Sequence, residues 1–119
     1  MNKKLGLLLN SKAARFTVHQ STLEALGEPN YVQFLINAEK KMIVLLPCEK
    51  NKPGSVAMPK PPYTTLVEHR FRFKRSLFIE RIFEIMGWEL GTSYQAWGQF
   101  SEGVGGAVFR LEDSTEVPS

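Results

Sequence analysis

Two stretches of the chain open in the same way and predict the same local structure twice. Residues Arg15–Gly27 read RFTVHQSTLEALG, and residues Arg70–Gly87 read RFRFKRSLFIERIFEIMG. Each begins with Arg-Phe and alternates between polar and apolar residues, which is typical of a half-buried strand. Each then reaches a serine that can cap a helix, Ser21 (with Glu24 in a capping-box pattern) or Ser76, and ends at a glycine, which favours helix termination. The sequence therefore predicts a strand followed by a short helix in each half.

Further strands are expected on either side of these two stretches. A run of β-prone residues precedes each stretch, and two such runs around a short polar turn follow it. The preceding strands are expected at Leu5–Leu9 and Tyr63–Val67, and the hairpins at Tyr31–Ile36 with Met42–Leu46 and at Tyr94–Phe100 with Ala107–Leu111. Because the first hairpin is apolar at nearly every position, both of its faces are expected to be buried.

The repeated pattern predicts two units that share one core. The offset between the halves is 55 residues at Arg15 and Arg70 and 63 at Tyr31 and Tyr94, because the second helix and its following loop are longer. A half of about 45 residues cannot bury a sufficient core alone, whereas two halves facing each other can. Chance similarity between two β-α-β-β segments is the alternative explanation. The predicted fold class is mostly β with short helices (α+β), built from two β-β-α-β-β units about an approximate twofold axis.

The chain divides into four parts on this interpretation. Residues 1–48 form the first unit and residues 63–112 form the second. Residues 49–62 contain four of the seven prolines and three lysines, so they are expected to form a Pro/Lys-rich connector. Residues 113–119 are polar and are expected to form a disordered tail.

Composition and cysteine usage indicate a cytoplasmic protein. The chain is 43% hydrophobic and 23% charged, as is usual for soluble globular proteins. No window approaches the roughly 18 consecutive apolar residues of a membrane-spanning helix. The single cysteine, Cys48, excludes a disulfide within the chain and favours a buried thiol in a reducing compartment.

The charges are unevenly distributed along the chain. Residues 1–75 carry 13 basic and 5 acidic residues, a net charge of +8, whereas residues 76–119 carry 2 basic and 7 acidic residues, a net charge of −5. Such a division indicates either a side that faces a polyanion or a dipolar surface.

Residues Leu7–Pro47, LLLNSKAARFTVHQSTLEALGEPNYVQFLINAEKKMIVLLP, resemble an AbrB/SpoVT-type swapped-hairpin domain of the MraZ/MazE-like superfamily. Arg15 falls where that family has the arginine of its Gly-Arg turn, and Leu26-Gly27 falls on its helix end. The second half, Tyr63–Leu111, matches more loosely, and MraZ-like proteins carry two such units in one chain. The resemblance implies a barrel of exchanged hairpins and a bacterial or archaeal transcription regulator or antitoxin, commonly a homodimer.

The chain departs from this family at positions that matter for DNA binding. The family's glycine before the arginine is Ala14 here, its proline is His19, and its helical Arg-Arg pair is Leu23-Glu24. The first half has therefore lost most of the DNA-facing charge that the resemblance implies. The second half partly restores this charge through Arg70, Arg72, Lys74, Arg75 and Arg81.

The basic strand of the second half is the best functional candidate. Its alternate residues, from Arg70 to Lys74, would project from one face about 6.6–6.8 Å apart, close to the phosphate spacing along a nucleic acid strand. Arg75 extends the cluster to the start of the helix, where free amides favour anions. The alternative interpretation is a charged edge strand that prevents edge-to-edge pairing. The expected DNA-binding residues are Lys12, Arg15, Arg70, Arg72, Lys74 and Arg75.

Other chemistry-bearing residues point to no reaction. His19 and His69 are isolated and have no metal-ligand spacing around them, so no metal site is expected. Trp88, Tyr94 and Trp97 either offer stacking surfaces for bases or belong to the core.

The leading hypothesis is a small, non-enzymatic DNA-binding transcription regulator that contacts duplex phosphates. The Gly103–Gly106 loop lacks the Gly-Lys-Ser/Thr ending of a phosphate-binding loop, and no nucleophile has a patterned base nearby. No cofactor or small-molecule substrate is expected. The alternative is a non-catalytic protein-interaction module, antitoxin-like or a dimerising scaffold, that kept the fold and lost DNA binding.

Overall fold

The computed structural model describes residues 5–12, 15–50, 52–53, 55–58, 70–74 and 76–117, with residues 70–74 and 76 described by their backbone. The elements in chain order are β1 (Leu5–Asn10), β2 (Arg15–His19), α1 (Gln20–Ala25), β3 (Tyr31–Asn37), β4 (Met42–Cys48), β5 (Ser55–Ala57), β6 (Arg70–Lys74), α2 (Ser76–Met86), β7 (Ser93–Ser101), β8 (Gly106–Arg110), the 3-10 turn η1 (Leu111–Asp113) and β9 (Thr115–Val117).

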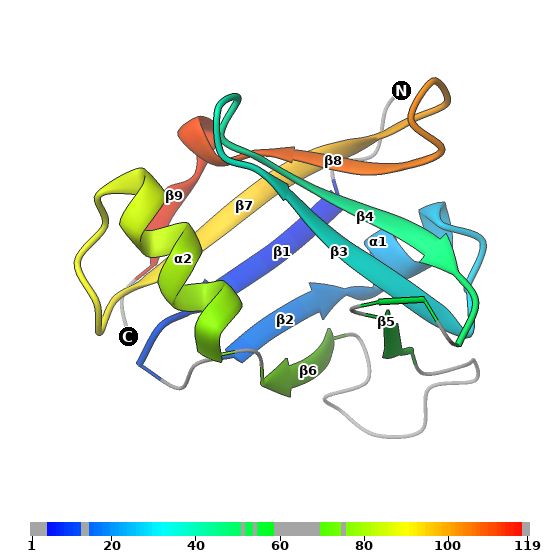
Figure 1. The fold of residues 1–119 in the computed structure, drawn as a ribbon, viewed down its shortest axis with the longest axis horizontal. Helices are drawn as coiled ribbons and strands as arrows, with labels where there is room; N and C mark the ends of the chain where they lie inside the picture. The colour runs from blue at the N-terminus through cyan, green and yellow to red at the C-terminus, as the bar shows by residue number, and fades with distance from the viewer. Residues whose placement is uncertain are drawn as a thin grey trace.

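The strands form one antiparallel sheet that curls around a core (Figure 1). Their order is β5-β3-β4-β8-β7-β1-β2-β6, with β9 paired to the free part of β7. The helix α2 lies at one end of the curled sheet and α1 lies toward the other (Figure 1). The prediction of a mostly β fold with short helices is confirmed.

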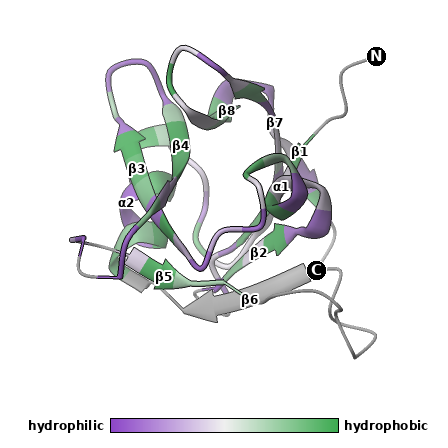
Figure 2. Ribbon diagram, turned by 90° about the vertical axis from the view of Figure 1, so that its right-hand side faces the viewer, coloured by the Kyte–Doolittle hydropathy of each residue, from purple (hydrophilic) through white to green (hydrophobic). Residues whose placement is uncertain are grey.

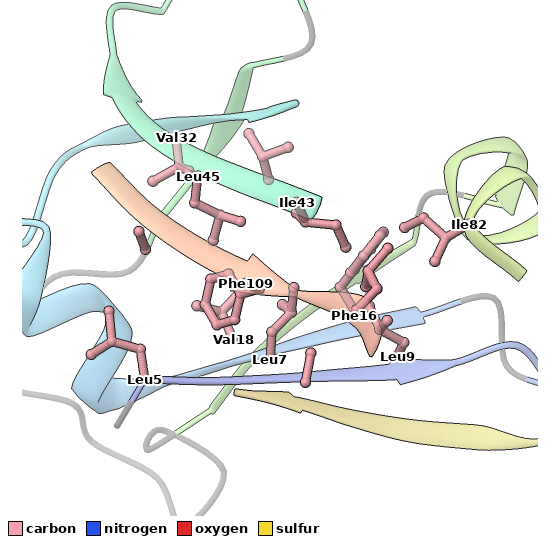
Figure 3. Packing of buried hydrophobic residues seen from close by; sticks show 14 of the residues in the cluster. Leu5, Leu7, Leu9, Phe16, Val18, Val32, Ile43, Leu45, Ile82 and Phe109 are labelled. Atoms are coloured by element: carbon pink, nitrogen blue, oxygen red, sulfur yellow. The ribbon is translucent and has the colours of Figure 1, made fainter. Parts of the chain in front are cut away.

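A single hydrophobic core fills the inside of the curled sheet. Alternate residues of the first two strands point inward, so Leu7, Phe16 and Val18 are fully buried. Figure 3 shows these side chains converging with others from β4, β8 and α2. Leu23 of α1 and Ile82 of α2 join the same cluster. Both predicted units therefore contribute to one core.

Both helices end at the predicted glycines through the same hydrogen-bond pattern. At α1, the amide of Gly27 donates to the carbonyl of Glu24 at 3.1 Å, and the next amide donates to Leu23 at 2.8 Å. At α2, the amide of Gly87 donates to Glu84 at 3.2 Å, and the next amide donates to Phe83 at 2.9 Å. Each glycine has a positive φ, +82° and +69°, which favours a residue without Cβ. These are Schellman motifs, so the prediction that both glycines end helices is confirmed.

The predicted capping box at the start of the first helix is wrong. Helix α1 begins at Gln20, one residue before Ser21, and its N-cap is His19, which makes no side-chain cap hydrogen bond. The reason is that β2 runs directly into the helix, so the last strand residue takes the N-cap position and Ser21 lies inside the first turn.

The first hairpin is buried on one face rather than on both. Val32, Ile43 and Leu45 are fully buried, but Leu35 is 40% exposed and its cross-strand partner Val44 is half-buried. Because the sheet is a single curled layer, one face of the hydrophobic strands β3 and β4 lies outside (Figure 2).

Two segments expected to be irregular contain short strands. Within the predicted connector, Ser55–Ala57 forms β5 and pairs with β3. In the predicted tail, Thr115–Val117 forms β9 and pairs with Ser93–Gln95, because β8 covers only the other end of the long strand β7. The predicted strand Tyr63–Val67 lies outside the described residues.

Replacing Gly98 by alanine is expected to destabilise the protein by about 1–3 kcal/mol. A Cβ atom at this position would overlap the carbonyl oxygen of Val108 and lie 2.7 Å from Cδ1 of Phe109, and neither the strand nor the buried ring can move freely. Gly103, in the β7–β8 turn, is the matched control, because its Cβ would meet nothing closer than 4.0 Å. Urea unfolding of both variants measures the difference, and equal midpoints would contradict the close approach at Gly98.

Candidate nucleic-acid interface

The two Arg-Phe segments lie side by side in the sheet as the antiparallel pair β2 and β6. Their register pairs Arg15 with Lys74, Thr17 with Arg72, and His19 with Arg70. Directly opposite residues of an antiparallel pair belong to the same face. The sheet therefore places the register positions of the predicted basic strand next to β2, the strand that carries Arg15. Arg75 lies outside the described residues.

The half of the sheet around this pair carries positive charge alone. We call strands β7, β1, β2 and β6 the basic half-sheet. Their residues include four basic side chains, Arg15, Arg70, Arg72 and Lys74, and no Asp or Glu. The strands of the other half carry a single basic residue, Arg110, which lies 3.8 Å from Asp113 in an exposed ion pair. The positive charge borne by strands is thus concentrated in the basic half-sheet, whereas the strands of the other half carry Arg110 and Glu116.

The turn that carries Lys12 is attached to a loop from the far end of the chain. The Ser11 amide and hydroxyl both donate to the carbonyl oxygen of Thr92, at 3.1 and 2.9 Å, and the hydroxyl accepts from the amide of Gly91 at 2.7 Å. Lys12 itself is exposed beside this contact. The hydrogen bonds of Ser11 therefore hold the turn after β1 in place, and this turn carries the exposed Lys12. Sequence reasoning missed this serine because its partners are about 80 residues away.

Arg81, the remaining basic residue of the second half, does not join the basic half-sheet. It lies on α2 and its guanidinium donates to the Glu84 carboxylate at 3.4 Å, with both side chains largely exposed. The neighbouring carboxylate offsets its charge, so Arg81 adds little to a polyanion-binding surface.

The three candidate stacking residues divide into core and surface. Trp88 and Tyr94 stack on each other with ring centroids 3.8 Å apart and an interplanar angle of 4°. Both also pack edge-on against the buried ring of Phe83. These two rings therefore belong to the core. Trp97, by contrast, lies on the outer side of β7 and is 37% exposed.

A row of residues crosses the basic half-sheet at Trp97. Trp97 is the Cα partner of Gly6 on β1, and His19 lies on the other side of that glycine. A Cβ atom at Gly6 would lie 2.6 Å from Cε1 of His19, so the imidazole occupies the space that the missing side chain leaves. The His19 and Trp97 rings meet edge to face with centroids 6.2 Å apart. The glycine in mid-strand was the one sequence signal for this close approach.

The described residues meet the requirements of neither a metal site nor a membrane-spanning helix. Within the ranges that the structure describes, no three His, Cys, Asp or Glu residues are grouped so that they could hold a metal ion. His69 lies outside those ranges. None of the described helices is long and apolar enough to span a bilayer.

Comparisons with known proteins identify no family for this chain. No family model, no curated protein and no solved structure matches the chain. The resemblance to AbrB/SpoVT-type domains therefore stays a prediction.

Proposed function

We propose that this protein is a small DNA-binding regulator that contacts phosphates through its basic half-sheet. The observation that carries the proposal is the register of β2 with β6, which brings Arg15 level with Lys74 and places Arg72 and Arg70 along the same ladder. Four cationic residues on adjacent strands without a carboxylate favour a polyanion. Lys12 is exposed on the turn that follows β1, close in sequence to β2.

The physical basis of such binding is the release of counterions from DNA. Alternate residues of a strand repeat about every 6.6–6.8 Å, so one strand can follow successive phosphates of a nucleic acid backbone. Contacts of this kind position the DNA and do not read its sequence. The proposed activity is therefore strong at low salt and weak in sequence preference.

The strand pairing also supports the proposal that two swapped-hairpin units interlock within one chain. Strands in equivalent places of the two units pair with each other, β2 with β6 and β4 with β8. The first strand of unit one pairs with β7, a hairpin strand of unit two, rather than with its own hairpin. On the far side, β5 pairs with β3 in the place that corresponds to β1 beside β7. An approximate twofold axis through the β2–β6 and β4–β8 ladders accounts for these pairings.

The outer face of the first hairpin favours a second candidate function, a protein-interaction module. Leu35, Val44 and Val108 form one apolar row across β3, β4 and β8 on this face. Leu35 is 40% exposed. A homodimer or another protein could cover this row. Light scattering over a dilution series, with Leu35→Glu as the comparison, tests whether self-association uses it.

Removing one basic residue from the basic half-sheet is expected to weaken DNA binding and its salt dependence. Plots of log K against log salt have a negative slope. Arg15→Ala and Arg72→Ala should each make this slope shallower by about 0.9 for every phosphate that the variant no longer neutralises. Arg110→Ala is the matched control, because it removes the same charge from the opposite half of the sheet. Titrations of a random duplex at several salt concentrations provide the slopes. Equal slopes for all three variants, or no duplex binding at low salt, would exclude the proposed function.

A further inference from the structure

We propose that strand β9 is a strap that opens independently of the rest of the sheet, and that its opening loosens the turn carrying Lys12. The strap thereby regulates the proposed contact of this turn with a polyanion. The regulatory part of this inference rests on the proposed function, whereas the opening itself is a property of the fold.

The first argument is the small extent of the pairing that holds β9. The strand pairs with β7 through three residue pairs, from Gln95 with Thr115 to Ser93 with Val117 (Figure 1). Two of its three residues are exposed. On the other side of β7, by contrast, β1 pairs through six residues and also pairs with β2. Segments with few buried contacts open most readily, so β9 should detach at a lower free energy than the central strands.

The second argument is an unpaired polar group at the start of the strap. Ser114 connects η1 to β9, and its hydroxyl oxygen is buried with no hydrogen-bond partner among the described residues. The Ser114 amide does donate, to the carbonyl of Leu111 at 3.0 Å, so only the side chain lacks a partner. A buried unpaired hydroxyl destabilises the closed state, and it regains water when the strand detaches.

The hinge of the strap lies just after Leu111. The side chain of Leu111 is fully buried, and its amide donates to the carbonyl of Lys41 at 3.0 Å. This residue is therefore fixed to the first hairpin, whereas the next two residues are exposed. Detachment of β9 can thus begin between Leu111 and Ser114 without moving the core.

The third argument is the position of the strap next to the hydrogen bonds of Ser11. Val117 pairs with Ser93, and the residue before Ser93 is Thr92, whose carbonyl accepts both hydrogen bonds from Ser11. When β9 detaches, Ser93 keeps its neighbour on β1 alone, so the carbonyl of Thr92 is held less firmly. The turn with its exposed lysine then becomes more mobile, and ordering it on a phosphate costs more entropy.

The simpler explanation is that β9 is a permanent part of the sheet and separates from β7 only when the whole protein unfolds. Amide hydrogen exchange of the wild-type protein at increasing urea concentration distinguishes the two. Exchange in the β7–β9 ladder should hardly depend on low urea, because a local opening exposes little surface, whereas exchange in the β1–β2 ladder should follow global unfolding. Equal urea dependence in both ladders would overturn the strap.

Replacing Ser114 by alanine tests the contribution of the unpaired hydroxyl. Ser114→Ala removes a group that destabilises the closed state alone, so exchange in the β7–β9 ladder should become about five- to one-hundred-fold slower. Ser101→Ala is the matched control at the other end of β7, where the hydroxyl accepts from the amide of Val104 at 3.4 Å. This control should leave the β7–β9 ladder unchanged. Unchanged or faster exchange in Ser114→Ala would overturn the proposed hinge.

A disulfide across the β7–β9 ladder tests the control of the turn. Gln95 and Thr115 are directly opposite each other, so Gln95→Cys with Thr115→Cys can lock the strap. A Cys48→Ser background leaves these two as the only cysteines, and mass spectrometry identifies the bond. Amide exchange at Ser11 and Gly91 should be slower in the oxidised than in the reduced protein. The oxidised protein should also bind inorganic polyphosphate more tightly, because its turn stays ordered.

The failures of the two proposals are distinguishable. If the disulfide leaves amide exchange at Ser11 and Gly91 unchanged, β9 does not control the turn, and this inference is wrong even if the protein binds DNA. If the disulfide slows this exchange but neither polyphosphate nor duplex DNA binds at low salt, the proposed function fails and the regulatory role fails with it. Equal polyphosphate affinity of the oxidised and reduced proteins would overturn the regulatory role while leaving DNA binding intact.

Discussion

Replacing Phe16 by alanine is expected to lower the free energy of unfolding by about 3–5 kcal/mol. The ring is fully buried, and it contacts Phe34 and Phe78 with centroid distances of 5.3 and 5.5 Å. Phe34 and Phe78 also meet each other at 6.3 Å. Phe16 thus joins β2, β3 and α2, so its truncation removes packing from both predicted units at once. Such aromatic contacts add to the effect of the buried area.

Two control variants make this prediction specific. Phe16→Leu keeps most of the apolar volume and is expected to lose much less stability than Phe16→Ala. Leu77→Ala removes a large side chain that is 83% exposed at the start of α2, so it should change stability by no more than about 0.5 kcal/mol. Urea unfolding gives the three values. If the Phe16 and Leu77 variants unfold at the same midpoint, the three-ring contact is not central to the core.

Replacing Thr22 by valine should destabilise the protein by about 1–3 kcal/mol for each of two backbone groups that it leaves unpaired. The hydroxyl of Thr22 accepts from the amide of Gly6 at 3.1 Å and donates to the carbonyl of the same residue at 3.0 Å. Strand β2 ends at His19, so α1 supplies the hydrogen bonds that the ladder no longer provides. Thr22 is fully buried, so the amide and carbonyl of Gly6 would lose their hydrogen-bond partner in a buried place, which costs free energy.

A serine variant at the same position separates the contribution of the hydroxyl to stability from that of the methyl group. Thr22→Ser keeps the oxygen and loses one buried methyl, which corresponds to about 1 kcal/mol. Chemical denaturation should therefore rank the wild type first, the serine variant second and the valine variant last. A valine variant as stable as the serine variant would show that the paired hydrogen bonds at Gly6 contribute little.

Local patterns in the sequence account for much of the secondary structure. Gly27 and Gly87 end the two helices as their position after apolar runs predicts, because only the nearby residues decide such an end. The mostly β class follows from alternating strands in the same way. The predicted start of α1 at Ser21 is wrong, because the local capping pattern is not the only influence on where the helix begins. Strand β2 is held by its pairing and runs directly into the helix, so His19 becomes the N-cap.

Pairing between distant strands accounts for what the sequence could not reveal. The basic residues were visible as charges, but their approach to Arg15 depends on the register of strands some 55 residues apart. The row from Trp97 through Gly6 to His19 needs the pairing of β1 with β7, for which no local pattern exists. Leu35 was expected to be buried because its hairpin is uniformly apolar, and only the curl of a single-layer sheet places it outside.

The pairing of Leu5 with Gly98, 93 positions later, has a consequence for biosynthesis. While the ribosome is still translating the middle of the chain, β1 has emerged without the strand that covers one of its sides. The apolar run Leu7–Leu9 then stays accessible to chaperones until β7 leaves the exit tunnel. Proteins whose contacts are so distant in sequence fold slowly, typically within milliseconds to seconds. The sheet should therefore close only after β7 has been translated.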